Sequence, residues 1–399
     1  MNNKIIRRFD IKISVPIIGD SSISKLKPPT GFQYKKIKLD EYEYRNKITD
    51  ANNEPLEEYK NAIVEEDNGK YLMTFDLDET LEYDLSIPCN KSITRDYITF
   101  EKEFLLFKYF SLLHLIKEGD ISWHYKFFSI DSTTPARNNC ELKDKGKINS
   151  SPADMTTYFS EPMKITDEDV IEFDELLSYD DRVYQMLKNV ALDDFTFNYC
   201  IYDSTTNYKS LITILEVLFI EKSECKYKKR LLSKRISNFI GVNDKEIEEI
   251  KNNISNLYEL RNDVVHDGGE VPREKLNMLR DYTRRCIKKY MKCISKILKE
   301  QPEMKFDNVR KYIVKQIYNI IKNRENEKNL KMFSVILDGC KNLDEAKEKV
   351  KQLIETEKKK SLLVLICTPK VRHFWRCIFL WQRKGKNIEN TRQNSNYLL

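Results

Sequence analysis

The chain has 399 residues, and its 40% of hydrophobic residues are enough for two or three domains with sizeable cores. Only 10 Gly and 11 Pro favour a helix-rich chain. The formal net charge is +6, and the nine cysteines show neither a CxxC spacing nor a paired histidine spacing. This pattern argues against a zinc site or a disulfide framework and favours a reducing, cytoplasmic location. We expect neither a metal nor another cofactor.

The first 130 residues predict mostly strands. Five short segments rich in aromatic and β-branched residues are separated by polar or turn-forming residues: Asp10–Ile18, Phe32–Leu39, Tyr71–Leu85, Ile93–Phe100 and Ile121–Ile130. The apolar run Glu101–Lys117 lies between the last two and favours a helix. The basic start of the chain has no sustained apolar core and no small-residue cleavage site, so it does not resemble a signal peptide.

Residues 131–165 contain clusters of Ser, Thr, Pro and Asn, which predict a loop or a domain boundary. After this boundary the pattern changes to helices, which we expect at Asp167–Leu192, Asn207–Ile220, Lys226–Ile240, Asp244–His266 and Pro272–Glu300. Pro272 at the start of the last helix and Pro302 just beyond its end are typical helix start and stop signals. Residues 303–354 continue as basic helices.

The expected fold class is therefore α+β, with three parts. Residues 1–165 form a β-rich N-terminal domain with a regulatory or sensor role, residues 166–302 form a helical domain, and residues 303–399 form a basic helical C-terminal extension. The apolar stretch Leu362–Trp381 contains Pro369 and several charged residues, so we expect no membrane span.

The charge is distributed unevenly along the chain. Residues 1–194 contain 26 Lys and Arg against 37 Asp and Glu, residues 195–300 contain 21 against 15, and residues 301–399 contain 22 against 11. The front half is thus acidic and the back half basic. This distribution favours a polyanionic partner for the back half and suggests that the front half can shield it.

One motif has two competing interpretations. Phe75–Leu81 reads FDLDETL and resembles the nucleophile motif of haloacid-dehalogenase-like phosphatases, in which a first Asp attacks phosphate and a second acts as acid and base. However, hydrophobic and polar residues alternate from Met73 to Leu85. Such alternation is typical of an antiparallel strand with one exposed face, whereas the phosphatase motif follows a buried parallel strand. We therefore expect Asp76 and Asp78 to be dispensable for catalysis.

The most informative segment is Leu257–Gly269, which contains Arg261, Asn262 and His266 followed by two glycines that end the helix. Arginine supplies a permanent planar cation for a phosphate, histidine can exchange a proton near neutral pH, and an amide can orient either group. On a helical wheel Asn262 and His266 share one side, whereas Arg261 lies on the apolar arc and needs a buried partner or an interface. The alternative is structural: a surface histidine near a helix end, with an arginine whose stem covers the core. His114, His124 and His373 are expected to be packed or surface residues.

The surrounding pattern resembles a HEPN domain, most similar to the Apea-like branch of that superfamily. The resemblance covers residues 195–300, which contain two helical stretches (ILEVLF and LLSKRISNFIG), the segment YELRN with HDGG, and a closing amphipathic helix Pro272–Leu298. It implies a small helical bundle that forms a homodimer so that two motifs line one cleft. In active members it implies metal-independent endoribonuclease activity, and its biological context is antiphage defence or a toxin-like response.

The resemblance implies a catalytic role for Arg261, Asn262 and His266. His266 would act as general base or acid, Arg261 would stabilise the phosphoryl oxygens, and Asn262 would position the histidine or the phosphate. Basic residues before and after the motif helix are candidates for binding RNA phosphates: Lys228, Lys229, Arg230, Lys234, Arg235, Arg284, Arg285 and Lys288. Two alternatives remain open, a solvated lysine-rich face with no RNA and a non-catalytic HEPN module that binds RNA or assembles with a protein partner.

Overall fold

The computed structural model describes residues 6–338 except 44, 53, 57–59, 61–62, 91–94, 120, 122, 124, 133–143, 150–161, 200–202, 222, 225 and 268–269, together with residues 345 and 348. The chain divides into two compact units, residues 1–321 and 322–399. The sheet, all helices up to α9 and the first half of α10 belong to the first unit. The α+β fold class is confirmed.

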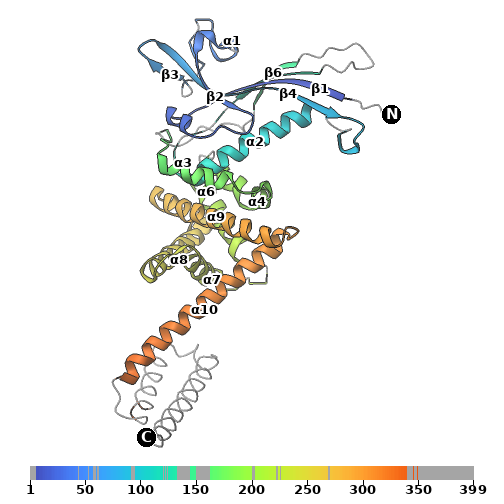
Figure 1. The fold of residues 1–399 in the computed structure, drawn as a ribbon. Coiled ribbons are helices and arrows are strands. Elements are labelled where there is room, and N and C mark those ends of the chain that lie inside the picture. Colours follow the sequence, from blue (N-terminus) through green and yellow to red (C-terminus); the bar gives the residue numbers. More distant parts are fainter. Residues whose placement is uncertain are drawn as a thin grey trace, which may run out of the picture. The chain divides into compact units, whose positions relative to one another are not determined.

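The N-terminal part of the first unit contains, among its described residues, a sheet of six antiparallel strands. These are β1 (Ile6–Pro16), β2 (Gln33–Lys38), β3 (Ile63–Glu66), β4 (Gly69–Asp84), β5 (Tyr125–Ser132) and β6 (Asp144–Asn149). Their order in the sheet is β2-β4-β1-β5-β6, and β3 also pairs with β4 (Figure 1). The long strand β4 runs along β1 from the pair Ile6 and Asp84 to the pair Pro16 and Thr74. Strand β6 lies within the segment predicted as a loop, and β3 was not predicted.

Alternation of side chains puts one face of the sheet into the core. The buried residues of this face are Phe9, Ile11, Ile13 and Val15 on β1 and Met73, Phe75 and Leu77 on β4. Successive residues of a strand point to opposite faces, so these alternate positions share one side. The strand predicted at Tyr71–Leu85 is confirmed. At one end of the sheet, a second small core around Leu72 and Tyr42 covers the other face.

Helix α2 (Arg95–Ile116) packs on the buried face of the sheet. The Phe75 ring lies 5.3 Å from the Tyr109 ring and 6.2 Å from the Phe110 ring, in both cases edge to face. The strand expected at Ile93–Phe100 is therefore wrong, because its described residues from Arg95 on are helical. Ile98 lies on the same buried helical stripe as Tyr109, and this tertiary packing overrides the β-branched composition of the segment.

The remaining helices follow in chain order: α3 (Asp167–Leu177), α4 (Asp181–Leu187), α5 (Asp193–Phe197), α6 (Ser204–Phe219), α7 (Lys228–Ile240), α8 (Asp244–Asp267), α9 (Arg273–Glu300) and α10 (Phe306–Asp338). Short elements complete the described chain: α1 (Arg45–Ile48), the 3-10 turns η1 (Ser21–Lys25), η2 (Leu39–Glu41) and η4 (Pro88–Asn90), and the π-helical turn η5 (Lys188–Leu192). The four helices predicted between residues 207 and 300 are confirmed, and the helices predicted over 303–354 are confirmed as far as Asp338.

The single helix predicted at Asp167–Leu192 is interrupted. Thr166 caps α3 through a reciprocal pair of hydrogen bonds with Asp169, and α3 ends at Leu177. Asp180 then starts α4, because its carboxylate accepts a hydrogen bond from the backbone N–H of Arg182. Aspartate at this position satisfies a free N–H of the first helical turn. The segment therefore forms two short helices that meet at Asp180.

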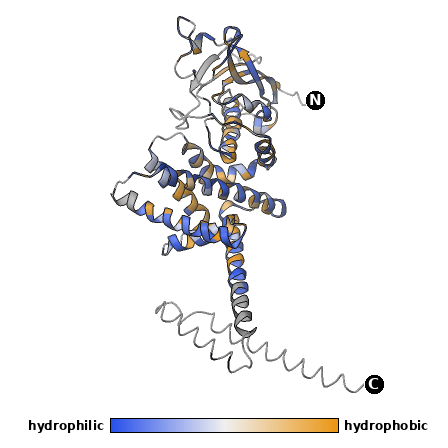
Figure 2. Cartoon of the chain, turned by 90° about the vertical axis from the view of Figure 1, so that its left-hand side faces the viewer, coloured by the Kyte–Doolittle hydropathy of each residue, from blue (hydrophilic) through white to orange (hydrophobic). Residues whose placement is uncertain are grey.

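One hydrophobic core joins the sheet to the helices. The Tyr109 ring of α2 lies 4.9 Å from the Phe173 ring of α3, and the Phe110 ring lies 4.5 Å from the Trp123 ring. Hydrophobic residues gather where the elements meet, and hydrophilic residues cover the outer faces of the helices (Figure 2). The predicted boundary after residue 165 marks the start of the run of helices from α3 onward, but the core continues across it.

Two glycines with almost the same backbone conformation lie in different surroundings. Gly119 has φ +145° and Gly69 has φ +140°, both in the region that side-chain-bearing residues rarely adopt. A Cβ at Gly119 would lie 2.6 Å from the Cα of Met163, whereas a Cβ at Gly69 would meet only the Lys38 side chain, at 3.9 Å. The chain after α2 therefore passes Met163 too closely for any side chain.

We expect Gly119→Ala to lower the free energy of unfolding by about 2–4 kcal/mol, because it adds a backbone clash to an unfavourable φ angle. Gly69→Ala is the matched control and should lower it by only about 1 kcal/mol, because it carries the φ penalty alone. Thermal and denaturant unfolding of the two variants measure the difference. Equal losses would show that the contact with Met163 is not tight.

Candidate active site

Arg261 and Asn262 lie in the C-terminal part of α8, and His266 lies in its last turn. The Arg261 side chain is half-buried and Asn262 is exposed. Arg261 Nη1 donates a hydrogen bond of 3.5 Å to Asn262 Oδ1. The His266 side chain lies outside the described part of the structure, so its distance to either group stays a prediction.

The apolar arc predicted for α8 packs on the core as far as its residues are described. Leu257 is 1% exposed, Tyr258 is buried, and Leu260 packs against the same core from its edge. Arg261 follows directly at the rim of this arc. Its guanidinium is close enough to the Tyr258 phenol for its charge to counteract the raised pKa of that group.

Tyr258 anchors the end of α8 to two other helices. Its hydroxyl donates to Glu216 Oε1 of α6 at 2.7 Å, and Lys228 Nζ of α7 donates to Glu216 Oε2 at 2.7 Å. Burial and the carboxylate of Glu216 raise the pKa of Tyr258 to about 12. Sequence reasoning missed this contact, although Tyr258 precedes Arg261 by three positions and thus lies beside it on the helix.

The predicted RNA-binding residues differ in their contacts. Four of them form ion pairs with carboxylates of neighbouring helices: Lys228 with Glu216, Lys229 with Glu259, Arg285 with Glu246, and Lys288 with Glu172. Arg230 is exposed and Lys234 is half-buried. The pair of Lys288 and Glu172, and a second pair of Lys292 and Glu175 at 3.0 Å, join α9 to the acidic helix α3.

Two of these residues require a correction, because Arg235 and Arg284 are buried. The Arg235 side chain is 10% exposed, binds both carboxylate oxygens of Glu224 at 2.5 Å, and donates to the carbonyl oxygen of Phe219 at 2.6 Å. These bonds use three of the five guanidinium N–H donors, and the burial of the side chain keeps it from a phosphate at the surface. The sequence could not show this, since a basic cluster looks the same whether its members face solvent or a carboxylate.

Arg284 connects the helical bundle to α2. Its side chain is 7% exposed, its Nε donates to the carbonyl oxygen of His114 at 3.2 Å, and its Nη2 donates to the Tyr199 hydroxyl at 2.8 Å. The carboxylate of Glu118 lies 3.4 Å away. Arg284 therefore satisfies an otherwise free carbonyl of the last turn of α2, which is a structural role.

The prediction that His114 is a packed residue is confirmed. Its ring is fully buried and stacks on the Tyr199 ring at a centroid distance of 4.3 Å and an interplanar angle of 14°. Burial, with help from the charges of Arg284 and Arg280, lowers the pKa of His114 to about 3, so the ring is neutral at physiological pH. His124 and His373 lie outside the described residues.

The two aspartates of the phosphatase-like motif lie in the antiparallel strand β4, as the alternation predicts. Asp76 accepts a hydrogen bond of 2.6 Å from Ser14 Oγ, and its carboxylate lies 3.2 Å from Lys35 Nζ. Asp78 is exposed and lies 3.8 Å from Lys12 Nζ. Both carboxylates thus take part in cross-strand contacts of the sheet.

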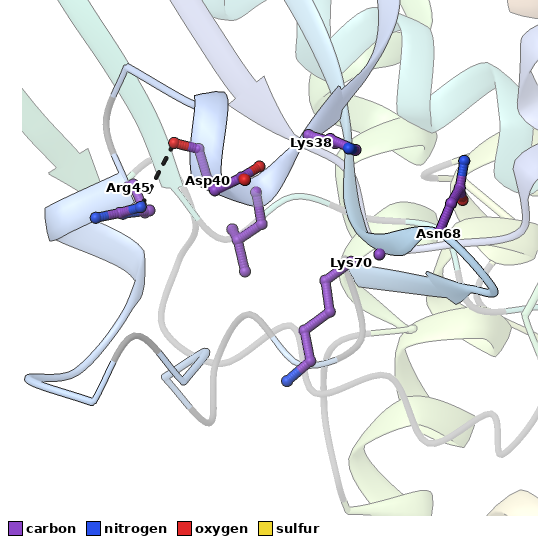
Figure 3. A pocket seen from close by; sticks show the side chains of 7 residues that line it. Lys38, Asp40, Arg45, Asn68 and Lys70 are labelled. Atoms are coloured by element: carbon purple, nitrogen blue, oxygen red, sulfur yellow. Dashed lines mark hydrogen bonds between the residues drawn. The ribbon is translucent and has the colours of Figure 1, made fainter.

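A shallow pocket of about 210 Å³ lies at the edge of the sheet, lined by Lys38, Leu39, Asp40, Arg45, Asn68, Gly69 and Lys70 (Figure 3). Arg45 donates to the carbonyl oxygen of Asp40 at 3.5 Å, and Lys70 forms an ion pair of 2.7 Å with Glu54. In Figure 3 the lysine and arginine side chains point in different directions rather than toward one centre. The pocket contains none of the predicted catalytic or RNA-binding residues.

Within the described residues, no group of three or more His, Cys, Asp or Glu side chains could hold a metal ion. In the same part of the chain, no helix is long and apolar enough to cross a membrane.

Comparisons with protein-family models, with curated proteins and with solved structures found no match for this chain. The site is therefore described by its own geometry.

We expect Arg235→Met to lower the free energy of unfolding by about 1–3 kcal/mol, because it leaves Glu224 without its charged partner. Arg230→Met is the matched control on the same helix and should change stability by less than about 0.5 kcal/mol, since Arg230 is exposed. Denaturant unfolding at neutral pH measures both. A loss of RNA affinity by Arg235→Met without a loss of stability would show that Arg235 binds RNA after all.

The same variant has a pH signature. The hydrogen bonds from Arg235 hold the pKa of Glu224 in the folded chain below its usual value. The pair therefore stabilises the folded chain at pH values above the pKa of the unfolded carboxyl group. This stabilisation is lost as the pH falls through the lower pKa of the folded state. Stability of the parent chain should therefore fall more steeply on acidification than stability of Arg235→Met.

Proposed function

We propose that this chain is a cytoplasmic, metal-independent endoribonuclease of the HEPN type, with Arg261, Asn262 and His266 as its catalytic residues. The observation that most supports this proposal is that the Arg261 guanidinium contacts an amide and forms no ion pair among the described residues. Its guanidinium is half-exposed, contacts the Asn262 amide, and has no carboxylate within ion-pair distance among the described residues. A cation held by a neutral amide keeps its full charge for a phosphate.

Basic residues of the neighbouring helix α7 differ from Arg261, because several of them form ion pairs. On α7, Lys228 and Lys229 form ion pairs with Glu216 and Glu259, and Arg235 pairs with Glu224. Glu259 precedes Arg261 by two positions, so it points to another side of α8 and pairs with Lys229. An arginine that has no carboxylate within ion-pair distance among the described residues supports a role in binding an external anion.

The proposed reaction is an attack of the ribose 2′-oxygen on the adjacent phosphorus. The 2′-O–P bond forms and the P–O5′ bond breaks, so the products are a 2′,3′-cyclic phosphate and a 5′-hydroxyl. His266 would take the proton of the 2′-hydroxyl or give one to the leaving O5′. Arg261 would stabilise the charge that develops on the phosphoryl oxygens, and Asn262 would orient Arg261 or His266.

We expect the chain to cleave labelled RNA in the presence of EDTA and to leave 2′,3′-cyclic phosphate ends. His266→Ala should lower the cleavage rate ~10²–10⁴-fold, because general acid–base catalysis contributes about this much. Arg261→Lys should also be poorly active, since an ammonium cannot reproduce the planar fork of a guanidinium. Undiminished cleavage by His266→Ala would contradict the assignment, and RNA binding without any cleavage would favour a non-catalytic HEPN module.

A second expectation concerns assembly. The HEPN resemblance and the position of Arg261 at the rim of an apolar arc support a homodimer in which two copies of the motif line one cleft. Sedimentation of the full chain at micromolar concentration should therefore give a dimer. A strict monomer that still cleaves RNA would exclude a site composed of two motifs.

The acidic and basic halves of the chain support a regulatory role for the front half, in antiphage defence or a toxin-like response. Two ion pairs join α3, which belongs to the acidic stretch 1–194 but lies in the predicted helical domain 166–302, to the basic helix α9. Because the core is shared between the sheet and the helices, point substitutions in α3 test this role better than a deletion does.

A further inference from the structure

Tyr227 combines an exposed aromatic ring with an unusual backbone conformation. It lies directly before α7, its ring is 77% exposed, and its φ and ψ angles are 65° and 25°. Among the described residues it is the only one other than glycine with a positive φ. Large residues rarely adopt this left-handed conformation, and the ring gains no burial within the chain in return.

The packing of α7 on α8 sets the position of Tyr227. The two helices are joined by the short segment 241–243, so they run antiparallel. Lys229 of α7 forms an ion pair with Glu259 of α8, and Lys228 and Tyr258 bind the same carboxylate of Glu216. Tyr227, directly before α7, therefore lies at the same end of the helix pair as the C-terminal part of α8, which contains Arg261.

The chain around Tyr227 is basic. Lys226 and Arg230 are exposed on either side of it, and Lys228 and Lys229 keep side-chain exposures of 36% and 40% despite their ion pairs. Proteins that bind single-stranded nucleic acid combine cations along the backbone with aromatic rings on which bases stack. An exposed tyrosine between cations has this combination, and it lies at the same end of the helix pair as Arg261, which has no carboxylate within ion-pair distance among the described residues.

We propose that Tyr227 is a stacking platform for an unpaired base of an RNA strand whose phosphate lies at Arg261. This inference rests on the proposed function and adds to it the substrate class, single-stranded RNA. In an RNA duplex the neighbouring bases cover both faces of each base. A base of the duplex therefore cannot stack on the Tyr227 ring unless it leaves the double helix. Tyr227 is thus a binding residue beside the catalytic groups, and it recognises a base face rather than a base sequence.

The test measures binding by fluorescence anisotropy, with the His266→Ala chain as parent so that the RNA stays intact. The probes are a short labelled single-stranded RNA and the same strand annealed to its complement. Tyr227→Ala should weaken binding of the single strand about 5- to 150-fold, which corresponds to the loss of one base–aromatic stack. Tyr227→Phe keeps the ring and should bind like the parent. Tyr318→Ala removes another exposed tyrosine, 59% exposed on α10, and should also bind like the parent.

The outcomes separate this inference from the proposed function. Two results would contradict the platform, even if the unmodified chain cleaves RNA. In the first, Tyr227→Ala binds the single strand as tightly as the parent does. In the second, Tyr227→Ala weakens binding of the duplex as much as binding of the single strand. If binding depends on the ring but the unmodified chain cleaves nothing, the platform stands and the ribonuclease assignment fails. If the parent chain binds no RNA the platform is wrong, and if the unmodified chain also cleaves none the ribonuclease assignment fails with it.

Discussion

The interaction on which the first unit most depends is the buried contact of Arg284 with the last turn of α2. The guanidinium of Arg284 binds the carbonyl oxygen of His114 and the hydroxyl of Tyr199 at once. Through it, the helix that covers the sheet is fixed to α9, the longest helix that lies wholly within the first unit. Removing a buried charge of this kind would leave several polar groups unpaired, so the contact fixes the sheet and the bundle as one body.

The same logic of paired charges identifies the candidate site. Carboxylates of neighbouring segments neutralise Arg235, Arg285 and Lys288, so the excess positive charge of the back half is smaller at its surface than its sequence suggests. Among the described residues Arg261 has no carboxylate within ion-pair distance, and its guanidinium contacts the exposed Asn262 amide instead. This state of Arg261, rather than the number of basic residues, supports the proposed site.

The sequence predicted the periodic elements and missed what depends on distant partners. Alternation in β4 and the apolar stripe of α9 are local signals, and both elements formed where they were expected. The start of α2 at Arg95 was missed because Ile98 packs in the core shared with the sheet, which no local pattern records. Burial of Arg235 was missed for a similar reason, since Glu224 and the carbonyl of Phe219 decide it. The catalytic role expected for His266 comes from the motif and its family resemblance, and no described contact adds to it.

The ion pairs between α3 and α9 have a consequence for counterions. Lys288 and Lys292 already hold the carboxylates of Glu172 and Glu175, so a phosphate that reached these lysines would displace a protein anion. When a lysine binds a phosphate, a counterion of the nucleic acid is normally released into solution, and this release favours binding. Here the gain would be offset, because the lysine would also free a carboxylate that repels the strand. Binding of RNA along α9 would therefore depend less steeply on salt than its lysine content implies, because α3 would act as a built-in competitor whose local concentration is fixed by the fold.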